Sequence, residues 1–193
     1  MNLLPGFTQP IELCQQNFRL ILKALSEPGV PVGLNGTAGW GRLGATATAV
    51  LLTLADGETP VWLSPELIES TAVDNLRFHT GAPLAGSLNS AVFAVFGQEI
   101  SDAQLRELPC GSEVSPEHSA TVLVQLEHLD QGAPLRLRGP GIKTQRVIAP
   151  SLPAAVRDYL LEGARRFPLG IDFLLVNADG LLALPRTTFV EES

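Results

Sequence analysis

The chain has 193 residues, of which 45% are hydrophobic and 17% charged, a composition typical of a globular soluble protein. Its formal net charge of −7, with no basic stripe in the sequence, argues against nucleic acid as the main partner. No apolar run approaches the roughly 20 residues needed to span a bilayer, and the first residues lack the basic start of a secretory signal, so we expect a cytoplasmic protein without a membrane partner.

Helical and strand patterns alternate along the chain. Segments with apolar residues at helical spacing or with helix-start signals predict helices at 9–26, 45–55, 65–76, 101–108 and 152–165. Short apolar segments predict strands at 30–34, 60–63, 91–96, 121–126, 135–138 and 145–148. Ser64 is the expected cap of the third helix, with Pro65 in its first turn. The alternation indicates an α/β domain with helices on both faces of a mixed sheet.

No repeat or linker interrupts this pattern. We therefore expect one domain over residues 1–193, whose ends at 1–9 and 189–193 are loose. At that length the chain can bury one sizeable core and is short of what usually forces a second domain.

The C-terminal part predicts a hairpin that carries two charged side chains. A buried strand through 173–176 leads to a turn at Asp179-Gly180, and a second strand follows. Asp172 lies at the entrance of the hairpin and Arg186 at its exit, and a tight hairpin brings these two ends together. The pair is either a structural ion pair at a sheet edge or part of a ligand contact.

Gly39, Gly41 and Gly44 match the G-x-G-x-x-G pattern of dinucleotide sites. That site needs a strand before the glycines and an acidic residue about 20 positions after them. Here the preceding strand is short and broken, and Asp56 comes too early. The pattern favours a flexible loop that leads into a helix.

Arg136 and Arg138 lie two apart on a predicted strand and so share one face. Gly139 and Gly141 follow directly and could let backbone amides approach an anion. A phosphate at this place is one interpretation, and a solvated sheet face is the other.

Several catalytic and metal-binding patterns are missing from the sequence. There is no P-loop and no G-x-S-x-G elbow, and Cys14 and Cys110 cannot hold an iron–sulfur cluster. His79, His118 and His128 lack metal-ligand spacing. We therefore predict no metal site and no residue that catalyses a reaction alone.

Five segments in order resemble a known family. They are SEPG at 26–29, LLTLAD at 51–56 with TPVWLS at 59–64, RFHTGAP at 77–83, LRLRGPGI at 135–142, and the tail at 167–188. Together they resemble the H subunit of the bacterial carbon–phosphorus lyase system for phosphonate use. The resemblance runs from about Phe18 to Thr188.

The resemblance implies a three-layer α/β/α sandwich with a mixed sheet, like the large domain of pyridoxal-phosphate transferases but without the cofactor. It also implies a place beside the G, I and J subunits in a cytoplasmic core complex. With an ATPase-like partner, that complex displaces adenine from ATP by a phosphonate and gives a ribose 1-phosphonate 5-triphosphate. A homodimer is implied for the isolated chain.

If this chain touches a phosphate-bearing ligand, the candidates are Arg77, His79, Arg136, Asp172 and Arg186. Arginines suit phosphate, and the carboxylate suits a hydroxyl or an ion pair. Two alternatives stay open, a purely structural adaptor and an independent pyridoxal-phosphate enzyme. The second needs a Schiff-base lysine, and neither Lys23 nor Lys143 stands where that lysine is expected between late strands.

Overall fold

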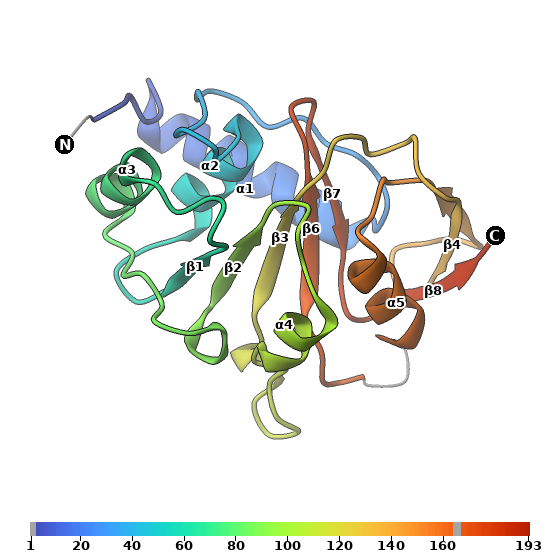
Figure 1. Cartoon of the computed structure of the whole chain (residues 1–193). Coiled ribbons are helices and arrows are strands. Elements are labelled where there is room, and N and C mark those ends of the chain that lie inside the picture. Colours follow the sequence, from blue (N-terminus) through green and yellow to red (C-terminus); the bar gives the residue numbers. More distant parts are fainter. Residues whose placement is uncertain (1–2, 164–166) are drawn as a thin grey trace.

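The computed structural model describes residues 3–163 and 167–193 (Figure 1). Its α-helices are α1 Pro10–Ser26, α2 Ala45–Leu54, α3 Ser70–Thr80, α4 Asp102–Glu107 and α5 Ala154–Gly163. Its strands are β1 Val61–Leu63, β2 Phe93–Phe96, β3 Thr121–Gln125, β4 Leu135–Arg138, β5 Arg146–Ile148, β6 Asp172–Val176, β7 Leu181–Leu184 and β8 Phe189–Glu192. None of the helices in the described residues is both long and apolar enough to cross a membrane.

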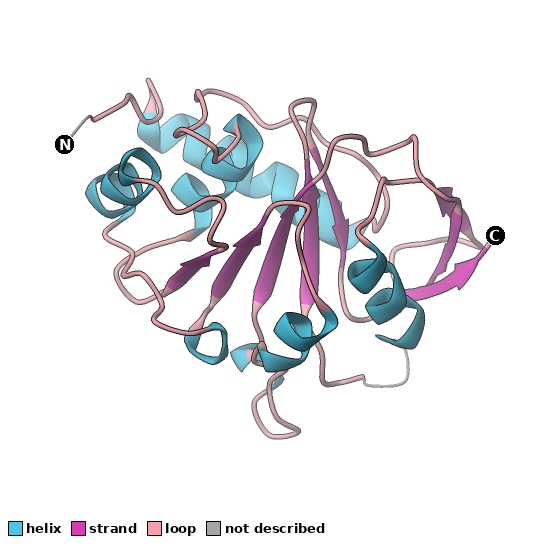
Figure 2. Ribbon diagram, viewed as in Figure 1, coloured by secondary structure: helices cyan, strands magenta, loops and turns pink. Residues whose placement is uncertain are grey.

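The described residues form a five-stranded sheet in the order β1-β2-β3-β6-β7. The first four strands run parallel, and β7 returns antiparallel to β6, so the sheet is mixed as predicted. Helices cover both of its faces (Figure 2). α1, α2 and α3 share a core with one face, and α4 and α5 share a core with the other. The predicted α/β class is confirmed.

Side chains of β6 show how the sheet divides the two cores. Successive residues of a strand point to opposite faces. Phe173 and Leu175 therefore lie in the core under α4 and α5, whereas Leu174 and Val176 lie in the core under α1 to α3. All four are buried. A strand buried on both faces is apolar throughout, and this run was recognisable in the sequence for that reason.

Three further strands form an antiparallel sheet in the order β5-β4-β8 within the described range. β8 pairs with β4 over its four residues, and Val190 of β8 is buried. The expectation of a loose end at 189–193 is therefore wrong for Phe189–Glu192. At the other end, the Leu4 N–H donates to Asn75 Oδ1 at 2.7 Å, so part of the expected loose segment at 1–9 is held by α3. Residues 1–2 lie outside the described residues.

Two predicted elements differ from the structure. The helix expected at 65–76 begins only at Ser70 and runs to Thr80, because Ser64 starts a turn in which its carbonyl oxygen accepts the Leu67 N–H at 2.8 Å. The Ser64 hydroxyl makes no capping bond to a described residue. The strand expected at 30–34 is reduced to a single bridge between Val32 and Leu181. Residues 164–165 of the last predicted helix lie outside the described residues.

Candidate functional site

Asp172 and Arg186 meet at the amino end of β6, as the hairpin predicted. Phe173 pairs with Leu184 across the hairpin, so the chain returns Arg186 to the side of Asp172. Arg186 Nη2 lies 2.6 Å from Asp172 Oδ2, and Arg186 Nε lies 3.2 Å from Oδ1. The backbone N–H of Arg186 also donates to Oδ1 at 2.8 Å. This is a two-pronged ion pair, the geometry in which arginine binds carboxylates most strongly.

The Arg186 guanidinium has little capacity left for a ligand. Besides Asp172, its Nη1 donates to the Pro116 carbonyl oxygen at 2.7 Å and its Nη2 donates to the Ser119 hydroxyl. A guanidinium carries five N–H groups, and these contacts use four of them. The two side chains are only 16% and 21% exposed. The pair fastens the β6–β7 hairpin to the segment before β3, and its contact with a ligand stays a prediction that depends on one N–H.

Two hollows adjoin this ion pair. One, of about 290 Å³, is lined by Pro116, Glu117, Phe167, Pro168, Asp172, Arg186 and Thr187. The other, of about 200 Å³, is lined by Pro140, Phe167, Arg186, Thr187 and Phe189. Phe167 and Phe189 are 60% and 50% exposed. Both hollows are lined mainly by apolar side chains and by Arg186, and the larger one also by the carboxylates of Glu117 and Asp172.

The structure separates the other candidates from this pair. His79, in the last turn of α3, places its Nε2 at 2.9 Å from the Leu4 carbonyl oxygen, so Nε2 carries a proton and donates it. Its ring stacks on Trp40, with ring centroids 5.3 Å apart. Arg77, two residues earlier, is exposed. Arg136 lies on β4 between Val147 and Glu191.

Arg136 is half-buried, and its Nε has no hydrogen-bond partner among the described residues. Arg138, on the same face of β4, is exposed. Figure 1 places α3 and β4 at opposite ends of the molecule. The five predicted ligand residues therefore occupy three places, and only Asp172 and Arg186 touch each other.

The glycine loop before α2 is pinned by side chains from elsewhere in the fold. Trp40 and Leu43 bridge across the loop, with Gly41 at a φ of +64° between them. Glu69 Oε1 accepts the backbone N–H of Arg42 at 2.5 Å. Gln125, the last residue of β3, accepts the Gly44 N–H at 2.7 Å and donates to the Arg42 carbonyl at 3.1 Å.

A carboxylate and an amide thus occupy the backbone N–H groups of the glycine loop that could otherwise face a pyrophosphate. The predicted helix after this loop is confirmed as α2. The loop itself is closed by these bonds, in place of the flexible loop that the sequence suggested.

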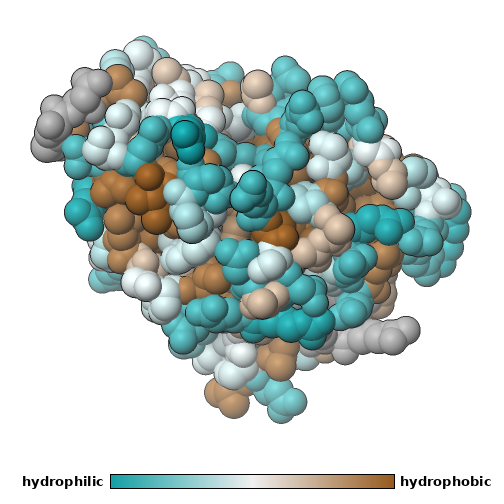
Figure 3. Space-filling model, in the orientation of Figure 1, coloured by the Kyte–Doolittle hydropathy of each residue, from teal (hydrophilic) through white to brown (hydrophobic). Residues whose placement is uncertain are grey.

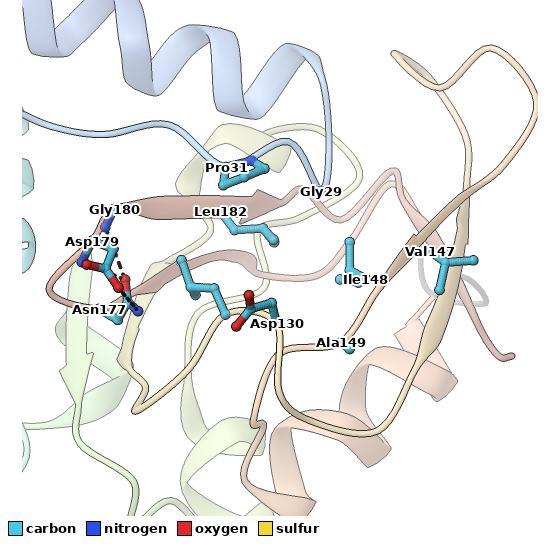
Figure 4. Close-up of a pocket in the computed structure, with 11 residues that line it drawn as sticks. Gly29, Pro31, Asp130, Val147, Ile148, Ala149, Asn177, Asp179, Gly180 and Leu182 are labelled. Carbon is cyan, nitrogen blue, oxygen red and sulfur yellow. Dashed lines mark hydrogen bonds between the residues drawn. The ribbon is translucent and has the colours of Figure 1, made fainter.

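A groove of about 470 Å³ opens past the carboxyl end of β6 (Figure 4). We call it the acidic groove; it is lined by Gly29, Pro31, Leu129, Asp130, Val147, Ile148, Ala149, Asn177, Asp179, Gly180 and Leu182. Ile148 and Leu182 are buried on its floor, whereas Asp130 and Asp179 are exposed. No arginine or lysine is among these lining residues, so the groove suits a cation or a hydrogen-bond donor and disfavours an anion.

Both carboxylates of the acidic groove stand on tied loops. The side chain of Asn177 accepts the N–H groups of Asp179 and Gly180, each at 3.0 Å. The Ser151 hydroxyl donates to the His128 carbonyl oxygen at 2.9 Å and accepts the His128 N–H at 3.0 Å, two residues before Asp130 in the chain. Sequence reasoning missed this groove because four separate segments build it, and only the Asp179-Gly180 turn was visible as a signal.

The two lysines do not fit a pyridoxal-phosphate site. Lys23 is exposed on α1, and Lys143 is exposed in the turn between β4 and β5. A Schiff-base lysine needs a pocket that holds the ring and phosphate around it. Neither lysine lines the acidic groove or the two hollows beside Arg186. Among the described residues, no group of three or more His, Cys, Asp or Glu side chains could hold a metal ion.

Comparisons with known proteins give a consistent picture. The family described as bacterial phosphonate metabolism protein (PhnH) matches residues 5–191. The alpha-D-ribose 1-methylphosphonate 5-triphosphate synthase subunit PhnH of Rhizobium meliloti (strain 1021) is 38% identical over 189 residues, which cover 96% of this chain and 94% of the relative. HtxG of Stutzerimonas stutzeri, whose assignment as a C-P lyase subunit protein is provisional, is 32% identical over 178 residues, or 91% and 85% of the two chains.

Proposed function

This chain belongs to the PhnH family of bacterial phosphonate metabolism proteins, and we propose that it is a subunit of the carbon–phosphorus lyase core complex in phosphonate catabolism. In that complex it supports the formation of a ribose 1-phosphonate 5-triphosphate from ATP and a phosphonate. The observation that carries this proposal is the match over nearly the whole length of both proteins to a relative named as a subunit of that synthase.

The finer points of the proposal concern fold, partners and place. We propose a three-layer sandwich like the large domain of pyridoxal-phosphate transferases. Its support is the order of layers, in which the mixed sheet lies between α1 to α3 on one face and α4 and α5 on the other. The partners are the G, I and J subunits, in the cytoplasm, and the isolated chain forms a homodimer. The family resemblance is the support for these partners.

The geometry supports a subunit that contributes surface rather than reacting groups. The strongest charged contact among the described residues, between Asp172 and Arg186, is shared with Pro116 and Ser119 and leaves one N–H. A general base or a nucleophile has to reach the substrate, and these groups are occupied by the fold itself. The adaptor interpretation fits the same contacts, and Arg186→Ala separates the two by measuring assembly apart from activity.

The test of the subunit role is genetic and biochemical. A phosphonate-using bacterium that lacks its own H subunit gene should not grow on methylphosphonate as the phosphorus source, and this chain should restore growth. Purified alone, the chain should not convert ATP and methylphosphonate, whereas the complex with the G, I and J subunits and the ATPase-like partner should. Failure to restore growth despite normal expression, or clear turnover by the chain alone, contradicts the proposal.

A further inference from the structure

The acidic groove combines uncompensated negative charge with exposed apolar surface. Asp130 and Asp179 are exposed, and neither takes part in an ion pair within the part of the chain that the structure describes. Asp179 Oδ2 lies 3.4 Å from the neutral amide Nδ2 of Asn177, which leaves its charge in place. Pro31 and Val147 are exposed apolar residues of the same groove. A molecule that binds here therefore needs both a positive charge and apolar surface.

The charged and the apolar parts of the groove are arranged along its length. In Figure 4, Asp179 lies at one end of the groove and Val147 at the other, with Asp130 between them. Asp179 belongs to the turn between β6 and β7, whereas Val147 belongs to β5. A molecule lying along the groove meets carboxylates at one end and an apolar side chain at the other. Its own cationic and apolar groups have to follow the same order.

A metal ion does not meet these requirements. Among residues 3–163 and 167–193, no group of three or more His, Cys, Asp or Glu side chains could hold one, and the groove offers two carboxylates. A bare cation would also leave the apolar surface exposed to water. The side chain of an arginine or a lysine covers apolar surface with its methylene groups and binds a carboxylate with its charged end. A basic side chain within an apolar segment therefore matches the groove.

The strand beside the groove favours a polypeptide as the bound molecule. β5 is an outer strand of the three-stranded sheet, and it lines the groove at 147–148. On the opposite side, the outer edge of β7 is closed, because Val32 and Gly29 donate their N–H groups to the carbonyl oxygens of Leu181 and Ala183 at 2.8 and 3.1 Å. No described strand closes the outer edge of β5 in this way. An open outer strand can pair with an extended segment of another chain.

We propose that the acidic groove is a docking site for an extended segment of another subunit of the complex. An arginine or lysine of that segment binds Asp130 and Asp179, and its apolar residues lie against Val147. This inference rests on the proposed function, which supplies the partner, and adds the surface and the chemistry of the contact. Apolar contact supplies most of the affinity, whereas the carboxylates select a basic segment and speed its association.

The experiment measures the dissociation constant of the full chain for a purified complex of the G, I and J subunits from the same bacterium, by biolayer interferometry. Asp130→Asn and Asp179→Asn should each raise the dissociation constant about fivefold, because each removes one attractive pair. Asp130→Lys combined with Asp179→Lys sets like charges against each other and should raise it about a hundredfold. Added salt should weaken the binding of the parent more than that of the double asparagine variant.

Glu58→Lys combined with Glu113→Lys is the matched control. It makes the same change in net charge at two exposed carboxylates that do not line the acidic groove. The dissociation constant should change by less than about twofold. Thermal unfolding checks that all variants are folded. An unchanged dissociation constant for the double lysine variant at Asp130 and Asp179, or an equal effect of the control, overturns the proposal.

A photo-cross-link identifies the segment that docks. p-Benzoylphenylalanine in place of Val147, in the purified complex with the G, I and J subunits, should link to a segment of one of them that carries an arginine or lysine beside apolar residues. The same group in place of Val114, which is 93% exposed outside the groove, should not link to that segment. A segment without a basic residue, or no link to another subunit from position 147, contradicts the docking site.

The two proposals can be told apart when they fail. A parent chain that neither binds the G, I and J subunits nor restores growth on methylphosphonate contradicts the subunit role, and the docking site with it. A parent chain that does both, while the double lysine variant at Asp130 and Asp179 binds equally well, contradicts the docking site alone.

Discussion

The charged side chains at the two ends of β6 have opposite environments. At the amino end, Asp172 is held by Arg186 and is only 21% exposed. Past the carboxyl end, about 15 Å away along five residues of strand, Asp130 and Asp179 stand exposed at the acidic groove. The carboxylate at the amino end is bound within the fold, whereas the carboxylates past the carboxyl end are exposed and can contact another molecule. A charged pair that is easy to recognise in a sequence is thus not by itself a sign of a binding site.

The charges of the chain and of its surface bear on which ligands the acidic groove can bind. Figure 3 shows apolar and polar residues interspersed over the visible face of the molecule. Carboxylates outnumber cations in the chain, 20 to 13. A phosphate-bearing ligand therefore needs a local concentration of arginine, and the acidic groove does not offer one among its lining residues.

The largest expected effect is the loss of Arg186. Arg186→Ala leaves the Asp172 carboxylate mostly buried without its cation and removes the donor to the Pro116 carbonyl. Breaking such a pair costs about 3 kcal/mol of unfolding free energy. Urea unfolding measures this loss. Arg138→Ala, at an exposed arginine at the end of β4, should change it by less than about 0.5 kcal/mol.

The Asp172–Arg186 contact can be isolated by a double-mutant cycle. Asp172→Ala and Arg186→Ala each leave one member of the pair without its partner, so the double variant should be more stable than the sum of the two losses predicts. We expect a coupling of about 1–3 kcal/mol, measured by unfolding of the four proteins. Additive losses would mean that the ion pair contributes no coupling and that the other contacts of Arg186 hold the hairpin.

Gly41→Ala should have an intermediate effect at the carboxyl edge of the sheet. Gly41 has a φ of +64°, and a Cβ there would stand 1.4 Å from Glu69 Oε1, which would have to release the Arg42 N–H. The backbone strain and the lost hydrogen bond together cost about 1–2 kcal/mol. Gly86→Ala is the control, since a Cβ at Gly86 meets nothing within 4 Å. Equal stability of the two variants would show that the loop is not pinned.

The smallest effect is expected in the acidic groove. Asp130→Asn and Asp179→Asn keep the shape of the side chain and remove an exposed charge, so each should change the unfolding free energy by less than about 0.5 kcal/mol. Thermal unfolding at low and high salt checks this. A loss as large as that of Arg186→Ala would show that charged side chains at both ends of β6 contribute equally to stability, which contradicts the difference described above.

Most of the main elements could be predicted from sequence because their signals are local. The apolar run of β6, the turn at Asp179-Gly180 and the amphipathic pattern of α1 each lie within one segment. The start of α3 was misplaced because the turn after Ser64 uses the same residues that a helix start uses. β8 was missed because a short strand of mixed polarity is stable only when β4 lies beside it.

The sequence by itself determined the family, the α/β class and the meeting of Asp172 with Arg186, since each depends on neighbours in the chain or on the order of motifs. Only the tertiary structure decided that Arg186 has one free N–H, that Glu69 and Gln125 close the glycine loop, and that the acidic groove exists. The physical reason is that hydrogen-bond capacity and concave surface are shared among segments far apart in the chain, and no local pattern records how they are shared.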